Sequence, residues 1–141
     1  MLNITIINGP NLNLLGKREP TVYGNETFDD CLAQLKATYS NVNFTYFQSN
    51  IEGELVDAIQ KAGFDQDGII LNPAAYTHTS VAIGDAIASI KTPVIEVHIS
   101  NVHAREDFRK ISHVSAKAVG SIVGLGLKGY ALATEWFINK K

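Results

Sequence analysis

Two side chains with complementary proton chemistry stand two positions apart in the apolar stretch 94–98. They are Glu96 and His98, and side chains two apart on a β-strand share one face. A carboxylate beside an imidazole fixes the tautomer of the ring and favours its protonated form, which suits a general acid near neutral pH. The alternative interpretation is a buried histidine whose hydrogen bonds are satisfied at a strand end.

A phenol and a guanidinium lie five residues apart in the long segment 8–23, which follows an apolar run at residues 2–7. A free tyrosine titrates near pH ~10 and is a poor base, but a nearby cation stabilises its phenolate. Most strand-to-helix loops span about 2–6 residues. We therefore expect this segment to fold over a pocket and deliver Arg18 and Tyr23. Simple packing of Tyr23 onto the body of the protein is the alternative.

Two further segments offer groups that bind polar ligands. Residues 72–80 contain Asn72, His78 and the N–H groups of a helix start, which can hold an anion. The alternative is that Thr79 or Ser80 only caps the helix. Residues 99–101 lead into a turn with Arg105 and Arg109, where free N–H groups and one arginine suit a carboxylate. A solvated arginine is the alternative there.

Metal and disulfide chemistry have little support in the sequence. His78 and His98 are possible metal ligands, but a third ligand is missing and carboxylates near them are sparse, so we expect no zinc site. The single cysteine, Cys31, excludes a disulfide within the chain and a multi-cysteine metal site. We expect it to fill space on a helix.

Short apolar or β-branched segments alternate with segments of helical periodicity. Strands are expected at residues 3–8, 42–48, 68–72, 94–98 and 120–123. Helices are expected at residues 28–39, 52–62, 79–90 and 127–139, with a short turn at 104–110. Thr27 is expected to cap the first helix and Gly63 to end the second. This alternation predicts one α/β domain over residues 1–141, a flavodoxin-like three-layer sandwich with a five-stranded parallel sheet of order 2-1-3-4-5.

Such a sheet places the polar segments together. Ligands of open α/β sheets bind beyond the carboxyl ends of the strands, where the strand order reverses. The reversal falls between the first and third strands, with the fourth beside the third. The segments leaving these three ends, residues 8–23, 72–78 and 96–101, hold an unusual share of the chain's Asn, His, Arg and Tyr. We therefore expect one site at this edge.

Composition excludes several classes of function. The chain has 141 residues, 45% of them hydrophobic, and a net charge of −2, without the clustered Lys and Arg that a nucleic-acid surface needs. No apolar run is long enough to span a bilayer and no N-terminal targeting signal is visible. The sequence predicts a cytoplasmic protein that binds neither nucleic acid nor membrane.

Four stretches, in this order and at this spacing, resemble the type II 3-dehydroquinate dehydratases. They are INGPNLNLLGKREPTVYG (residues 7–24), LNPAAYTHTSVA (71–82), VIEVHISNVHAREDFR (94–109) and GSIVGLGLKGY (120–130). The resemblance covers essentially the whole chain, although Ala74-Ala75 stands where many members have a glycine. It implies a hydro-lyase that removes water from 3-dehydroquinate in an anti sense, through an enolate and without cofactor or metal, to give 3-dehydroshikimate in the pathway to aromatic amino acids.

The same resemblance implies a role for each residue. Tyr23 takes the proton next to the ketone, and Arg18 keeps Tyr23 ionised. His98, oriented by Glu96, protonates the departing hydroxyl, and Asn11 holds a water against the developing enolate oxygen. The implied substrate-binding groups are the side chains of Asn72, His78 and Arg109, for hydroxyls, and the N–H groups of Ile99 and Ser100, for the carboxylate. Arg105 supports the site indirectly.

Asp85 lies toward the polar side of the segment 79–90, where the simplest interpretation is a solvated side chain. In the resembling family this position reaches the site of a neighbouring subunit, which implies a homo-oligomer, a dodecamer of four trimers. The rival hypothesis is a non-enzymatic flavodoxin-like module, either a flavin carrier or a receiver domain. The first loop lacks a Ser/Thr-rich phosphate cradle, and Asn8 and Asn72 stand where a receiver needs aspartates. A biosynthetic and a quinate-degrading role both stay open.

Overall fold

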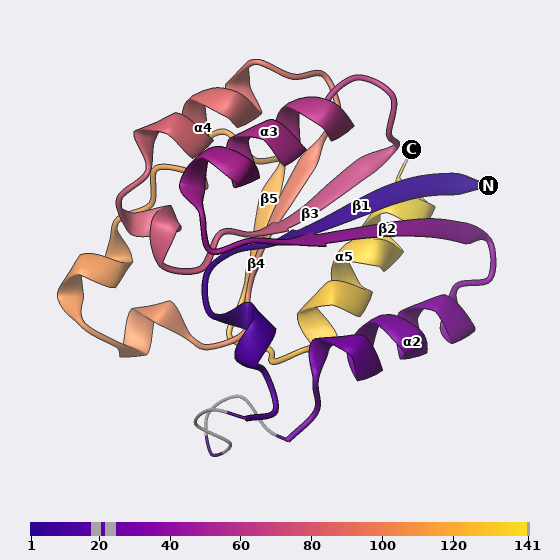
Figure 1. The fold of residues 1–141 in the computed structure, drawn as a ribbon, viewed down its shortest axis with the longest axis horizontal. Helices are drawn as coiled ribbons and strands as arrows, with labels where there is room; N and C mark the ends of the chain where they lie inside the picture. The colour runs from indigo at the N-terminus through magenta and orange to yellow at the C-terminus, as the bar shows by residue number, and fades with distance from the viewer. Residues whose placement is uncertain (18–20, 22–24, 141) are drawn as a thin grey trace.

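One parallel sheet of five strands lies between two layers of helices in the computed structural model, which describes residues 1–17, 21 and 25–140 (Figure 1). The strands are β1 (Leu2–Asn8), β2 (Val42–Gln48), β3 (Gly68–Asn72), β4 (Val94–His98) and β5 (Gly120–Val123). Their order in the sheet is β2-β1-β3-β4-β5. This confirms the predicted α/β fold class and strand order.

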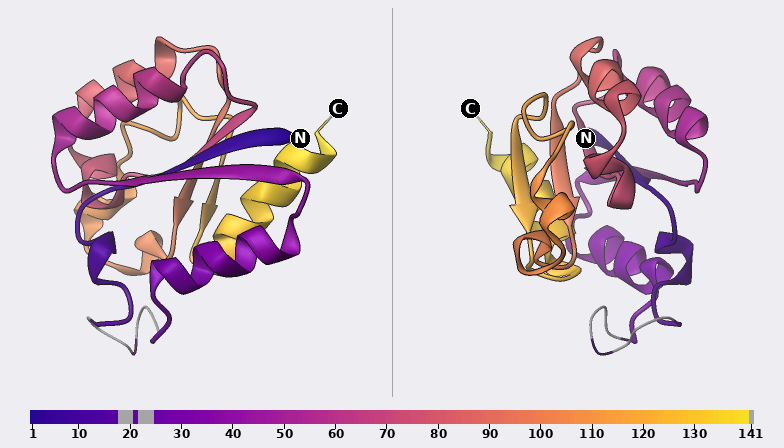
Figure 2. Two further views of the ribbon diagram at one scale, coloured as in Figure 1. Left: turned by 45° about the vertical axis from the view of Figure 1, so that its right-hand side comes forward. Right: turned by 90° about the vertical axis from the view of Figure 1, so that its left-hand side faces the viewer.

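The helices cover both faces of the sheet. They are α2 (Phe28–Thr38), α3 (Glu52–Ala62), α4 (Val81–Ala88) and α5 (Lys128–Asn139). One core cluster joins α2 and α5 to Ile4 and Ile6 of β1, and the other joins α3 and α4 to Ile7 of β1 and Leu71 of β3. The two layers lie on opposite sides of the sheet (Figure 2). Every residue of the central strands β3 and β4 is buried, as expected for parallel strands covered on both faces.

The expected helix ends are confirmed at α2 and α3, although one of them for a different reason. Thr27 caps α2: its hydroxyl accepts from the Asp30 N–H at 3.2 Å, and the Asp30 carboxylate accepts from the Thr27 N–H at 3.2 Å. Gly63 ends α3, but its φ of −76° is ordinary helical backbone. A Cβ at Gly63 would collide with Ile90, so close packing between α3 and the end of the α4 segment explains the glycine.

β1, α2 and α5 each differ from the expected bounds by one residue. The larger differences concern one helix and one turn near the carboxyl edge of the sheet. The helix expected at residues 79–90 spans Val81–Ala88. It begins after Ser80 because the Ser80 hydroxyl caps it, accepting from the Ile83 N–H at 2.9 Å. A separate 3-10 turn, η2 (Ala74–His78), precedes it. The turn expected at 104–110 is divided into two 3-10 turns, η3 (Val102–Ala104) and η4 (Asp107–Lys110).

None of the helices in the described part of the chain has the length and hydropathy needed to traverse a bilayer.

Candidate active site

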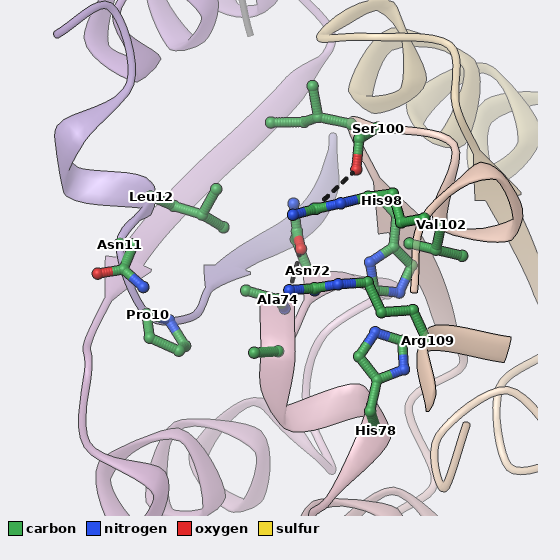
Figure 3. Close-up of a pocket in the computed structure, with 13 residues that line it drawn as sticks. Pro10, Asn11, Leu12, Asn72, Ala74, His78, His98, Ser100, Val102 and Arg109 are labelled. Carbon is green, nitrogen blue, oxygen red and sulfur yellow. Dashed lines mark hydrogen bonds between the residues drawn. The ribbon is translucent and has the colours of Figure 1, made fainter. Parts of the chain in front are cut away.

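The polar segments meet in a pocket at the carboxyl edge of the sheet. Asn8 and Asn72 are register partners at the ends of β1 and β3, and β4 lies on the other side of β3. Figure 3 shows His78, His98 and Arg109 on one side of this pocket and Asn11 on the other. The pocket is lined by Pro10, Asn11, Leu12, Asn72, Ala74, Ala75, His78, His98, Ile99, Ser100, Val102, Arg105 and Arg109.

The predicted contact between Glu96 and His98 is confirmed. Nε2 of His98 lies 2.5 Å from Oε2 of Glu96, because the two-residue repeat of β4 turns both side chains to one face. Glu96 is 1% exposed. Since Nε2 faces the carboxylate, Nδ1 of His98 is the ring nitrogen left for a ligand.

Glu96 is ionised despite its burial. Burial by itself raises the pKa of this carboxyl, but hydrogen bonds from His98, Ser115 and Thr77 and the charge of His98 outweigh it and lower the pKa to about 2. A carboxylate that stays charged beside an imidazole stabilises the imidazolium form, which is the form a general acid needs.

The surroundings of His78, in contrast, favour the neutral form of its ring. Its Nδ1 lies 2.7 Å from the Ile111 carbonyl oxygen, and because a carbonyl only accepts, Nδ1 carries the proton and Nε2 is left as an acceptor. Burial lowers the pKa of His78, and the Ile111 hydrogen bond opposes this only in part. The rings of His78 and His98 are nearly parallel, with centroids 6.4 Å apart. The pocket thus pairs a neutral imidazole with one that lies against a carboxylate.

Asn72 is oriented by a residue that sequence reasoning did not single out. Its amide nitrogen donates to the Tyr130 hydroxyl at 3.0 Å, and that hydroxyl donates to the Asn8 oxygen at 2.8 Å. The amide oxygen of Asn72 accepts from the Ala74 N–H at 3.0 Å. One amide N–H of Asn72 therefore remains for a ligand.

The first loop is tied to the pocket through Asn11. The Asn11 N–H donates to the Asn50 side chain at 2.9 Å, and its φ of 70° is left-handed, a conformation that asparagine tolerates. Gln48 donates to the Gly9 carbonyl at 3.1 Å and to Asn50 at 3.2 Å. The end of β2 and the loop after it therefore hold Asn11 at the pocket rim.

Two arginines supply positive charge to the same pocket. Arg109 donates from Nε to Glu106 at 2.7 Å and lies over the Phe108 ring. Arg105 donates from Nη1 to the Ser100 hydroxyl oxygen at 3.4 Å. Together with Ile99 and Ser100, which follow β4 directly, they form a wall suited to an anionic ligand.

Among the described residues, two predicted site residues do not line this pocket. Glu96 is buried and bonds His98, which does line it. Asp85 is exposed on α4 and does not line it. Arg18 and Tyr23 lie outside the described residues. Four other residues were missed by sequence reasoning: Thr77, Ser115 and Ser121, which contact Glu96, and Tyr130, which contacts Asn72. Tyr130 lies on α5, and the periodicity of a helix indicates that the side chain is buried but not that its hydroxyl meets a polar partner.

Within residues 1–17, 21 and 25–140, no group of three or more His, Cys, Asp or Glu side chains is arranged to hold a metal ion. The described pocket offers an imidazole beside a carboxylate, a neutral imidazole, two amides and two guanidinium groups. This set can transfer a proton and can bind a small, hydroxylated anion.

Comparisons with known proteins agree on one family. A sequence profile described as Dehydroquinase class II matches residues 2–138. The 3-dehydroquinate dehydratase of Acinetobacter baylyi is 56% identical over 140 residues, which cover 97% of this chain and 94% of that protein. The catabolic 3-dehydroquinase 1 of Aspergillus fumigatus is 56% identical over 135 residues, covering 94% of this chain and 90% of the relative. The crystal structure of the type II dehydroquinase from Butyrivibrio crossotus superimposes with a TM-score of 0.93 at 47% identity, covering 98% of both chains.

Proposed function

The chain belongs to the class II dehydroquinase family, and on that premise we propose that it is a 3-dehydroquinate dehydratase, a hydro-lyase that converts 3-dehydroquinate to 3-dehydroshikimate. The observation that carries the proposal is the buried Glu96–His98 pair, 2.5 Å apart, which opens onto a pocket lined by arginines. The identity of about half or more to relatives named for this activity supports it over nearly the whole chain.

The proposed reaction is an anti elimination through an enolate. The Tyr23 phenolate, kept ionised by Arg18, takes the proton from the carbon next to the ketone, and the electron pair of that C–H bond forms the enolate. Asn11 holds a water against the enolate oxygen, where negative charge develops. The enolate then collapses, the C–O bond breaks, and His98 protonates the leaving hydroxyl, which departs as water.

The same pocket supplies the groups that we propose bind the substrate. We assign the substrate hydroxyls to Asn72, His78 and Arg109, and the carboxylate to the N–H groups of Ile99 and Ser100. The neutral state of His78 supports this, because its free Nε2 accepts a hydrogen bond from a hydroxyl without adding charge.

The assembly is the second part of the proposal. Asp85 is exposed in the single chain, and we infer that it completes the site of a neighbouring copy in a trimer, with four trimers forming a dodecamer. A cytoplasmic enzyme of the shikimate pathway, free of cofactor and metal, is the setting that the family resemblance favours. A quinate-degrading role is the alternative, and relatives carry names of both kinds.

The test is an ultraviolet assay of purified protein with 3-dehydroquinate. Absorbance of a conjugated enone is expected to rise, without loss on treatment with a chelator or with borohydride. Tyr23→Phe should lower kcat by at least about 100-fold, because its ring has no oxygen to accept a proton. The matched control, Tyr39→Phe, removes an exposed hydroxyl bonded to Glu135 and should retain activity.

Each component of the proposal has its own contrary result. Full activity of Tyr23→Phe would remove the assigned base. Inhibition by a chelator would restore the metal hypothesis. A yellow preparation without enone formation would favour the flavin-binding module.

A further inference from the structure

Glu96 is held by four hydrogen-bond donors from different parts of the chain. Its Oε2 accepts from His98 Nε2 at 2.5 Å and from the Thr77 hydroxyl at 2.6 Å. Its Oε1 accepts from the Ser115 hydroxyl at 2.5 Å and the Ser121 hydroxyl at 3.2 Å. A carboxylate has about four lone-pair sites. Glu96 therefore cannot rotate without losing a bond.

None of these four donors is a permanent cation. Among the described residues, the donors to Glu96 are three hydroxyls and one imidazole. Hydroxyls stabilise a buried negative charge without neutralising it. The titratable group that faces Glu96 is His98, with His78 beyond it. His98 is thus the partner through which Glu96 faces the pocket, and the three hydroxyls hold the carboxylate in place against its ring.

Thr77 differs from the two serines in position and in burial. It shares Oε2 with His98, whereas both serines bind the other oxygen. Thr77 is 2% exposed, whereas Ser115 and Ser121 are exposed residues. Water can replace a lost serine hydroxyl, but it has no access to the place of the threonine hydroxyl.

The backbone around Thr77 is fixed by neighbouring elements. The Thr77 carbonyl accepts from the His113 N–H at 2.8 Å, and the next residue, His78, donates to the Ile111 carbonyl. On the far side, Gly84 of α4 packs so closely on the His113 carbonyl that a Cβ would collide with it. The hydroxyl of Thr77 is therefore presented to Glu96 from a rigid support.

From this geometry we propose that Thr77 is a positioning residue for proton transfer: its hydroxyl keeps the shared oxygen of Glu96 directed at Nε2 of His98, so that Nδ1 faces the substrate. Thr77 does not line the pocket, so it acts through Glu96 and not by contact with the ligand. The kinetic part of this inference rests on the proposed function, whereas the structural part does not.

The variants separate the hydroxyl from the volume of the side chain. Thr77→Val keeps the shape and removes the donor, and Thr77→Ser restores the donor. The matched control is Thr79→Val, the same change at an exposed position two residues away. If Thr77→Val does not fold, as judged by circular dichroism, Thr77→Ala removes the same hydroxyl without a new methyl group to place.

The first measurement is a carbon-13 NMR titration of the Glu96 carboxyl in the free protein. In Thr77→Val the midpoint should rise by about 1–2 pH units, since a hydrogen bond to the charged form is lost without replacement. Thr77→Ser should return the midpoint to the wild-type position, and Thr79→Val should leave it there.

The second measurement is kcat and KM with 3-dehydroquinate. Thr77→Val should lower kcat roughly tenfold or more, because the acid is no longer held in line with the leaving group. Its KM should stay within about twofold, and Thr77→Ser should recover kcat. An unchanged Glu96 midpoint, or a shifted midpoint with unchanged kcat, would overturn the proposal. If wild-type protein forms no enone, the proposed function fails, and the NMR titration still decides the contact.

Discussion

At the scale of single residues, the site depends on one carboxylate that is charged although it is buried. An isolated ion in a protein interior is costly unless hydrogen bonds or a counter-charge compensate it. Glu96 accepts hydrogen bonds from three hydroxyls and interacts electrostatically with the ring of His98. These contacts therefore also contribute to folding stability, and that contribution depends on pH.

Glu96→Gln should reveal that dependence. The pKa of folded Glu96 is lowered from 4.5 to about 2, so its stabilising contribution is fully present above about pH 4.5 and is lost as pH falls through about 2. Between pH 6 and pH 2, the unfolding free energy of the wild type should fall by roughly 3 kcal/mol more than that of the variant. Urea unfolding at both pH values measures the difference.

Glu135→Gln is the control for this titration, because Glu135 is an exposed glutamate on α5. The unfolding free energy of Glu135→Gln should stay within about 0.5 kcal/mol of the wild-type value at each pH. Equal pH dependence of wild type and Glu96→Gln would mean that Glu96 is not charged in the folded protein.

Ala74 shows backbone strain at the wall of the pocket. Its φ is 53°, in the left-handed region that costs a residue with a Cβ about 1–2 kcal/mol. The Asn72 side chain offsets part of this cost by accepting from the Ala74 N–H. The Asn72 side chain thus also fixes the shape of the turn beside it.

At the scale of elements, α5 reaches through the core to the ends of two strands. The hydroxyl of Tyr130, which is fully buried, bonds Asn8 at the end of β1 and Asn72 at the end of β3. Burial raises the pKa of Tyr130, so the phenol remains a neutral donor. Helix α5 thereby sets the orientation of the Asn72 amide from within the core.

Tyr130→Phe should weaken both stability and binding. Loss of the Tyr130 hydroxyl leaves the Asn8 oxygen and one Asn72 N–H without a partner in a buried place. This should lower the free energy of unfolding by about 1–3 kcal/mol. The KM for 3-dehydroquinate should rise because Asn72 is no longer held. Chemical denaturation and steady-state kinetics measure the two effects. Tyr39→Phe, which removes an exposed hydroxyl, is the matched control, and an equal loss in both variants would contradict the role given to Tyr130.

At the scale of the whole molecule, the assembly that we propose brings residues of two copies of the chain into one site. The pocket gathers residues from the ends of β1, β3 and β4, but Asp85 lies exposed on α4, outside it. In the trimer that we propose, Asp85 reaches the site of a neighbouring copy through a head-to-tail contact that closes into a ring.

Complementation between two inactive variants tests this arrangement. Asp85→Ala and His98→Ala should each lower activity in pure form. Co-expressed and purified together, they should recover about a quarter of the wild-type sites, because random mixing joins an intact His98 to a neighbour's intact Asp85 in that share. Native mass spectrometry checks that mixed trimers are present. Mixed trimers without recovered activity would place Asp85 in the site of its own chain or outside any site.

The sequence by itself determined the parts of this protein that follow from periodicity. The bounds of β2, β3, β4 and β5 agree with the expected strands, because β-branched runs between turn residues have few other stable conformations. The contact of Glu96 with His98 was predictable for the same reason, since a strand repeats every two residues. The family resemblance pointed to the same edge of the sheet.

Only the tertiary structure decided which distant hydroxyls complete the site. Thr77 and Ser115 each lie 19 positions from Glu96, on opposite sides of it in the chain, and Tyr130 is 122 positions from Asn8. Hydroxyl side chains are common in turns and helices, so their type carries no sign of a buried acceptor. Which of them meets a carboxylate or an amide depends on the path of the backbone and on how the helices pack on the sheet. A local sequence pattern predicts neither.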